Sequence, residues 1–178
     1  AVQAYQKRGP QVIEAVAGIA RSSGRRLMVR LVKGAYWDSE IKRAQVAGLP
    51  GYPVYTTKAA TDVSYLACAR ALLDAAPHLY GQFATHNAHT LAAVRLMAGQ
   101  RGLSPEFQRL HGMGEALYAA AQERYGDFPL RVYAPVGSHE DLLPYLVRRL
   151  LENGANTSFV HALLDEKTPV SKVVVDPI

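Results

Sequence analysis

The chain has 178 residues, of which 49% are hydrophobic and 20% are charged, a composition that favours one globular domain or part of one over intrinsic disorder. The formal net charge is +5, but the basic residues are scattered and the densest short group is 21–26, so DNA binding is not indicated. The single cysteine, Cys68, excludes a framework of disulfides within the chain and fits a reducing, cytoplasmic compartment. No apolar run approaches the roughly 20 residues of a membrane-spanning helix, so we expect a soluble or at most peripherally attached protein.

Strand-like and helix-like segments alternate along the chain. Runs rich in β-branched and aromatic residues, which are typical of strands, cover 27–35, 52–56, 79–87, 107–112 and 131–137. Helical periodicity covers 10–21, 38–47, 61–75, 89–99, 114–124 and a last helix that is capped by Ser138 and stops at Gly154. This alternation predicts βα units and a parallel sheet, and therefore an α/β fold.

The spacing of the strands predicts part of a (β/α)8 TIM-type barrel. A strand begins about every 24 to 28 residues, and eight such units make roughly 250 residues, so this chain would hold four or five of them. A doubly wound open sheet also alternates, but it normally carries GxGxxG after its first strand, and the nearest match, 111–115, is one glycine short. A partial barrel would expose sheet edges unless another chain supplies the missing units.

Polar and aromatic residues gather where the expected strands end, which is where the active sites of barrels lie. The segments are RLVKGAYWD (30–38), YTTK (55–58), FATHN (83–87), LHGMGE (110–115) and RVYAPVG (131–137). Gly34 would let a ligand approach the backbone closely. His86 and His89 form HxxH and His111 ends a later strand, but no carboxylate base stands between the first two, so no metal site is expected. Cys68 lies in mid-helix and GxSxG is absent, so no nucleophile is expected.

The last helix has a polar side and an apolar side. Tyr145, Arg148, Arg149 and Glu152 recur at i, i+3, i+4 and i+7, and the opposite side is formed by Leu143, Leu146, Val147, Leu150 and Leu151. On periodicity alone, such a polar stripe is most often exposed to solvent.

Five long strings follow one another over nearly the whole chain. They are RLVKGAYWDSEIKRAQ, YPVYTTKAATDVSYLACARALL, QFATHNAHT, LHGMGE and YAPVGSHEDLLPYLVRRLLENGANTSF. In this order they closely resemble the proline dehydrogenase family, in particular the flavin domain of bacterial bifunctional proline utilization A proteins. The resemblance implies a distorted (β/α)8 barrel with FAD at the strand carboxyl ends, of which this chain is about strand 4 to helix 8. Residues 1–161 would be the C-terminal portion of the barrel, and 162–178 a linker toward a following aldehyde dehydrogenase domain.

The resemblance also implies an activity. The family consists of FAD-dependent oxidoreductases acting on CH–NH donors, which oxidise L-proline to 1-pyrroline-5-carboxylate by hydride transfer to flavin N5. The electrons would pass to a membrane quinone in the first step of proline catabolism, with the protein cytoplasmic, peripheral on the inner face of the membrane, and homo-oligomeric. The family's early strands, with an active-site lysine and aspartate, are absent here, so the chain resembles a fragment that needs the remaining barrel strands for full competence.

By the resemblance, two sets of positions surround the two ligands. Those around FAD are Gln3, Arg30, Val32, Lys33, Gly34, Ala35, Trp37, Thr56, Thr57, Lys58, Thr85, His86, Asn87, Glu152 and Phe159. Those around proline are Tyr36, Leu110, Tyr133, Tyr145, Arg148 and Arg149, and the same residues except Leu110, together with Arg30, form the catalytic set. The polar side of the last helix would then face the barrel mouth, with the guanidiniums on the proline carboxylate, and its leucine side would pack against neighbouring barrel elements.

Two other hypotheses remain open. The chain could be a non-catalytic fragment that only assembles with the missing half-barrel, and it would then retain little or no FAD. It could also be a non-flavin barrel lyase or aldolase that uses Lys33 or Lys58 as a Schiff-base amine, although the sequence offers no clear desolvated pocket for that amine.

Overall fold

A parallel sheet of five strands forms the centre of the molecule. The computed structural model describes residues 1–154, Pro169 and Ser171, except for the side chains of 151–154. The strands pair in chain order, and they are β1 (Val2–Gln3), β2 (Leu27–Val32), β3 (Leu79–Ala84), β4 (Glu106–Leu110) and β5 (Leu130–Tyr133). A barrel wall has this sequential order, whereas a doubly wound sheet reverses its order at a switch point. The predicted parallel α/β arrangement is confirmed.

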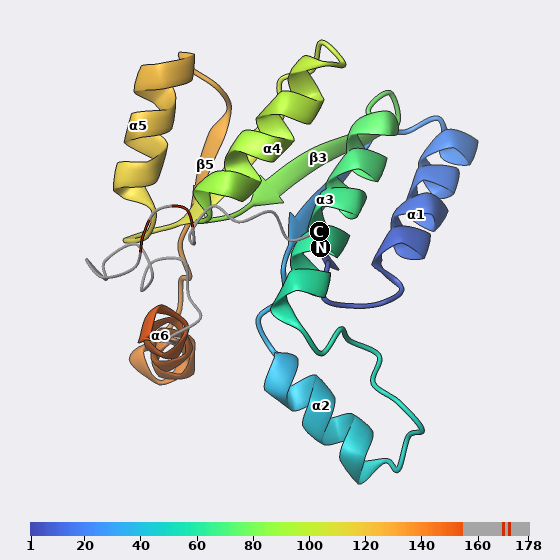
Figure 1. Ribbon diagram of the computed structural model, residues 1–178, viewed down its shortest axis with the longest axis vertical. Helices are drawn as coiled ribbons and strands as arrows, with labels where there is room; N and C mark the ends of the chain where they lie inside the picture. Colours follow the sequence, from blue (N-terminus) through green and yellow to red (C-terminus); the bar gives the residue numbers. More distant parts are fainter. Residues whose placement is uncertain (155–168, 170, 172–178) are drawn as a thin grey trace.

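Four helices cover one face of the sheet, and Figure 1 shows them in a row. They are α1 (Gly9–Ser23), α3 (Lys58–Asp74), α4 (Ala88–Gly99) and α5 (Glu115–Tyr125). The two other helices, α2 (Trp37–Val46) and α6 (His139–Gly154), lie apart from this row in the lower part of Figure 1, beyond the carboxyl ends of the strands. No helix in the described part of the chain is both long and apolar enough to cross a membrane.

The core lies between the sheet and the helix row. Alternate strand residues such as Leu31, Phe83 and Phe107 are fully buried, because side chains at positions i and i+2 of a strand point to the same face. Phe107 lies at the centre of an aromatic group, with its ring centroid 6.3 Å from Phe83 and 5.5 Å from Phe128. The other face of the sheet is open, and Met28 on it is 71% exposed. Such a face is expected of a barrel wall without its remaining strands.

The segment predicted as a strand at 52–56 is not one. Only Val54 pairs, in an isolated antiparallel bridge with Gln6, and the segment is held by bonds from the Lys7 N–H to the Pro53 carbonyl (2.9 Å) and from the Tyr55 N–H to the Tyr5 carbonyl (2.8 Å). Pro53 has no N–H to donate to a ladder, and Val54, one of the residues that suggested a strand, is fully buried without belonging to one. The short β1 was not predicted because two residues carry no periodicity.

The helix termini follow the capping residues. Thr57 and Asn87 accept hydrogen bonds from the N–H groups of Ala60 (3.3 Å) and Thr90 (2.9 Å), so α3 and α4 begin directly after them. Ser138 accepts from the Asp141 N–H at 3.3 Å, which confirms it as the cap of α6. Lys58, predicted at a strand end, is therefore the first residue of a helix.

The apolar side of α6 is uncovered in the described part of the chain. Leu143, Leu146, Val147 and Leu150 are all exposed, whereas Tyr145, Arg148 and Arg149 on the polar side are partly buried. Tyr145 and Arg149 on the polar side line the cavity at the carboxyl ends of the strands, whereas Arg148 does not line it and the Glu152 side chain lies outside the described residues. The expectation that the leucine side packs against barrel elements is wrong for this chain, because no described element lies against it.

Candidate active site

A cavity of about 540 Å³ lies at the carboxyl ends of the strands. This volume is within the range of roughly 300 to 1,000 Å³ that is usual for small-molecule sites. Fifteen of the predicted site residues line it, coming from all five strand ends, the start of α3 and the polar side of α6. They are Gln3, Arg30, Val32, Lys33, Gly34, Ala35, Tyr36, Lys58, Thr85, His86, Asn87, Leu110, Tyr133, Tyr145 and Arg149. Residues up to 146 positions apart in the sequence, Gln3 and Arg149, are thus brought to one rim.

The remaining predicted residues stand elsewhere. Trp37 donates its indole N–H to the Tyr55 carbonyl at 2.8 Å, Thr57 caps α3, and Thr56 is exposed. None of these three described residues lines the cavity. Glu152 belongs to α6, but its side chain and the whole of Phe159 lie outside the described residues.

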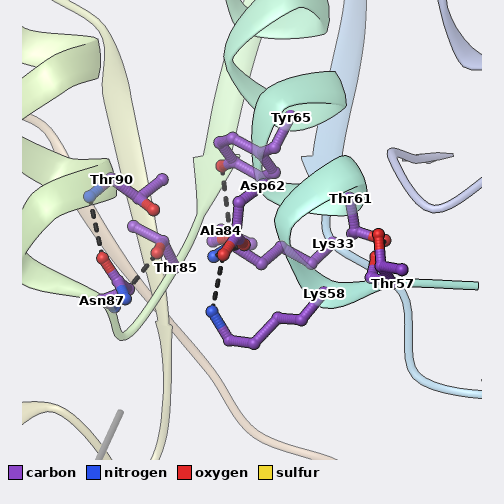
Figure 2. Close-up of polar contacts among 10 residues, drawn as sticks. All are labelled: Lys33, Thr57, Lys58, Thr61, Asp62, Tyr65, Ala84, Thr85, Asn87 and Thr90. Carbon is purple, nitrogen blue, oxygen red and sulfur yellow. Dashed lines mark hydrogen bonds and ion pairs between the residues drawn. The ribbon is translucent and has the colours of Figure 1, made fainter. Parts of the chain in front are cut away.

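Two lysines share one carboxylate on one side of the cavity (Figure 2). Lys33, directly after β2, and Lys58, at the start of α3, both form ion pairs with Asp62, the Lys58–Asp62 distance being 2.5 Å. Burial lowers the pKa of Lys33, and the Asp62 carboxylate opposes that effect. Burial raises the pKa of Asp62, but the two ammonium groups outweigh it and hold that pKa below its usual value. The group therefore combines two ion-paired ammonium groups with one carboxylate.

The Thr85–Asn87 turn is fixed by bonds that leave its central residue facing the cavity. Thr85 Oγ1 accepts from the Asn87 N–H at 3.1 Å, and the Thr85 carbonyl accepts from the buried Tyr118 hydroxyl at 2.8 Å. Figure 2 shows the chain of contacts from Thr85 through Asn87 to Thr90. The side chains of Thr85 and Asn87 accept hydrogen bonds from backbone N–H groups, and His86 between them lines the cavity.

His86 is neutral and held in one tautomer. Its Nε2 accepts from the Leu110 N–H at 3.0 Å, so the proton is on Nδ1. Burial, together with the positive charges of Arg149 and Arg109, lowers its pKa to about 4. Gly114 packs against the ring with φ +70°, and a Cβ there would lie 2.9 Å from His86 Cδ2. No cluster of three or more side chains suited to a metal occurs in the described part of the chain.

Aromatic rings and guanidiniums contact one another along the wall formed by β2, β5 and α6. Arg30 lies over Tyr133 at 5.0 Å, Tyr133 meets Tyr145 edge-on at 6.4 Å, and Arg149 lies over Tyr145 at 5.2 Å. Arg148 does not line the cavity but lies 4.3 Å from the centroid of Tyr36, which does. The Nε atoms of Arg30 and Arg148 are buried and have no hydrogen-bond partner among the described residues. Buried cationic N–H groups of this kind call for an acceptor, and an anion is the strongest one.

Gly34 has a packing role in addition to the one predicted. Its φ is +137°, and a Cβ on it would lie 2.4 Å from the ring of Tyr5, which is 2% exposed. The space that the missing side chain leaves is therefore taken by Tyr5, although the glycine also lines the cavity.

Several lining or supporting residues were not predicted. Gln108, Arg109 and Met113 line the cavity, and Arg109 holds the 110–115 turn through its contacts with the carbonyls of Leu110 (3.2 Å) and Met113 (3.3 Å). Asp62 was also missed, although its i+4 spacing from Lys58 on α3 is a signal for an ion pair. Its second partner, Lys33, is 29 residues away and has no local signal.

Comparisons with known proteins agree with this geometry. The family described as Proline dehydrogenase matches residues 1–162. The chain is 61% identical to the Bifunctional protein PutA of Escherichia coli over 183 residues, which is 99% of the chain and 14% of that protein. It is 31% identical to the Hydroxyproline dehydrogenase of Bos taurus over 163 residues, which is 85% of the chain and 34% of that protein.

A solved structure matches the whole arrangement of helices and strands. The crystal structure of a mutant of Bradyrhizobium japonicum Proline Utilization A (PutA) has a TM-score of 0.94 and 60% identity, over 99% of this chain and 18% of that one. This match confirms the predicted fold class, a (β/α)8 TIM-type barrel present in part. The chain spans about a seventh of the length of the E. coli relative.

Proposed function

Because this chain belongs to the proline dehydrogenase family, we propose that it forms the carboxyl-terminal part of the barrel of an FAD-dependent enzyme that oxidises L-proline to 1-pyrroline-5-carboxylate. The observation that carries the proposal is the cavity at the strand carboxyl ends, whose lining combines a pair of lysines with several tyrosines and arginines. A cavity of this composition suits a phosphate-bearing cofactor beside a small zwitterionic substrate.

The residues present fit FAD. The lysines beside Asp62 offer positive charge for its two phosphates, and the buried Nε of Arg30 needs an acceptor that no described residue supplies. Neutral His86 would donate from Nδ1, while Val32, Gly34 and Ala35 offer a surface without charge. Bound FAD would accept a hydride from the ring carbon next to the proline nitrogen. Arg30 would add positive charge beside the group that gains electrons.

The polar side of α6 would hold the substrate. Two adjacent guanidiniums, Arg148 and Arg149, can bind a carboxylate through paired charge-assisted hydrogen bonds, and the buried Nε of Arg148 is a donor without a described partner. Tyr36, Tyr133 and Tyr145 lie against these arginines or one another and would enclose the small apolar ring, with Leu110 below. Fixing the carboxylate on a rigid helix orients one ring face, and orientation is the main requirement of such a transfer.

The wider assignments rest on the relatives. We assign residues 1–161 to the barrel and 162–178 to a linker toward an aldehyde dehydrogenase domain in a longer bifunctional protein, because the E. coli relative is named bifunctional and is about seven times longer. A membrane quinone would accept the electrons in this first step of proline catabolism. That role requires the protein to reach the inner face of the membrane peripherally, and we propose a homo-oligomer.

One observation favours assembly as a second role. The leucine side of α6 is exposed, and β1 and β5 each have one neighbour in the described sheet, so further barrel strands would complete both. A Schiff-base lyase or aldolase is less well supported, because Lys33 and Lys58 are both engaged as ammonium groups with Asp62.

The test compares the 178-residue chain with a polypeptide extended upstream through the missing strands, called the whole-barrel protein below. We expect the whole-barrel protein to show flavin absorption and dye-coupled oxidation of L-proline, and the chain alone to retain little flavin. Absence of flavin from a folded whole-barrel protein would contradict the proposal. Borohydride trapping of substrate on a lysine would instead support the lyase.

A further inference from the structure

Asp62 is the one acidic side chain that joins the two lysines of the cavity among the described residues, and the proposed function gives it no role. It comes from the second turn of α3, one turn after Lys58, and it reaches across to Lys33 at the end of β2 (Figure 2). The lysines line the cavity and Asp62 does not. The carboxylate therefore lies behind the two ammonium groups as seen from the cavity.

The pair is not an ordinary surface ion pair. An exposed i,i+4 ion pair contributes little to the stability of a helix and does not fix either side chain. The Asp62 side chain is 16% exposed and bridges two elements. Asp74, at the other end of α3, is 56% exposed and forms an ion pair with Arg101 at a distance of 2.7 Å, and neither of these two residues lines the cavity. The two aspartates of one helix thus provide a buried case and a surface case.

The charges and donors leave room for an anion. Each ammonium has three N–H donors and gives one to Asp62, so within the described part of the chain two remain on each lysine. The three groups together carry a net charge of +1. Without the carboxylate, two neighbouring ammonium groups would repel each other, and the partly buried Lys33 would lose its charge or turn away.

We propose that Asp62 is a positioning residue that holds the Lys33 and Lys58 ammonium groups on the cavity wall as a preformed pair for the phosphates of the dinucleotide cofactor. This inference rests on the proposed function, because it takes FAD as the cavity's anionic ligand. Preformed donors bind more tightly than mobile ones because less side-chain freedom is lost on binding.

The test is Asp62→Asn in the whole-barrel protein, with Asp74→Asn as the matched control on the same helix. FAD affinity is measured by adding FAD to the apoprotein and following flavin fluorescence. We expect Asp62→Asn to weaken FAD binding by about tenfold, as expected for loss of a charge-assisted contact that orders a buried lysine, and Asp74→Asn to leave it within about twofold. Equal or tighter binding by Asp62→Asn would overturn the proposal.

A second measurement separates positioning from general support of the fold. Asp62 and Lys58 are the charged groups that act on Lys33, so Asp62→Asn should lower the Lys33 pKa further, as followed by NMR titration of the apoprotein. FAD affinity should then begin to fall at a lower pH than in the wild type. Loss of FAD without this change would indicate a merely structural role and overturn the proposal.

A conservative variant completes the test if Asp62→Asn does not fold. Asp62→Glu keeps the charge, and we expect FAD affinity within about threefold of the wild type, since a carboxylate still orders the lysines. If Asp62→Glu folds but binds FAD about tenfold more weakly than the wild type, which is the loss expected without the carboxylate, the proposal is overturned. If the folded wild type itself binds no FAD, the proposed function fails, which is distinct from failure at Asp62 alone.

Discussion

Replacement of Glu106 by glutamine tests how the barrel wall is held together. This carboxylate at the start of β4 accepts from Arg131 on β5 (2.8 and 3.0 Å) and from Gln82 on β3 and Gln108 on β4 (both 2.9 Å). These bonds, led by Arg131, outweigh burial and lower its pKa from 4.5 to about 2. At about 1.4 kcal/mol per pKa unit this corresponds to roughly 3 kcal/mol, and to about 2 kcal/mol after screening, because Arg131 is 59% exposed.

The sign of the pH dependence follows from the lowered pKa. The stabilisation is fully present above the unfolded value of 4.5 and is lost as the pH falls toward about 2. In urea unfolding of the whole-barrel protein, Glu106→Gln should therefore cost about 2 kcal/mol at pH 7, and the difference from the wild type should narrow below pH 4.5. Glu123→Gln, at an exposed position of α5, should change stability by less than about 0.5 kcal/mol. An unchanged gap between pH 7 and pH 3 would refute this reasoning.

Two glycines give further predictions. Gly114→Ala should strain the left-handed backbone by about 1 to 2 kcal/mol and displace His86, so FAD retention and Tm should both fall. Gly24 is also left-handed, but nothing lies within 4 Å of a Cβ placed on it, so Gly24→Ala should lower Tm and leave FAD retention unchanged. Gly34→Ala should destabilise the protein by more than Gly24→Ala in urea unfolding, because the new Cβ meets the buried Tyr5 ring; equal costs for the two would show that the ring moves freely.

Much of the fold could be predicted from local pattern. Strand and helix alternation gave the parallel sheet, and polar residues after strands indicated where a cavity lies, because parallel strands end at one edge. The segment 52–56 was wrongly predicted to be a strand. Val54 is buried and forms only an isolated bridge with Gln6, and composition alone does not distinguish such a bridge from a strand in a ladder. The leucine side of α6 is exposed among the described residues, and periodicity alone does not show whether a helix face has neighbours.

The supporting residues of the site were harder to predict than the lining ones. Asp62 meets Lys33 only because α3 packs beside the end of β2, and Glu106 meets Arg131 only through the register of β4 and β5. Contacts of this kind depend on tertiary structure, and a single sequence carries no periodic signal for them. Most lining residues, by contrast, followed from strand ends and from the resemblance to the family, although Gln108, Arg109 and Met113 did not.

The central claim, that the polar side of α6 holds the substrate beside the cofactor, is tested most directly by anaerobic reduction of the bound flavin by L-proline. In the wild-type whole-barrel protein, proline should bleach the flavin absorption. Arg148→Met and Arg149→Met should retain FAD but require about tenfold or more proline for the same bleaching, as expected when a charge-assisted contact to the carboxylate is lost. Unchanged proline dependence in both variants would contradict the account.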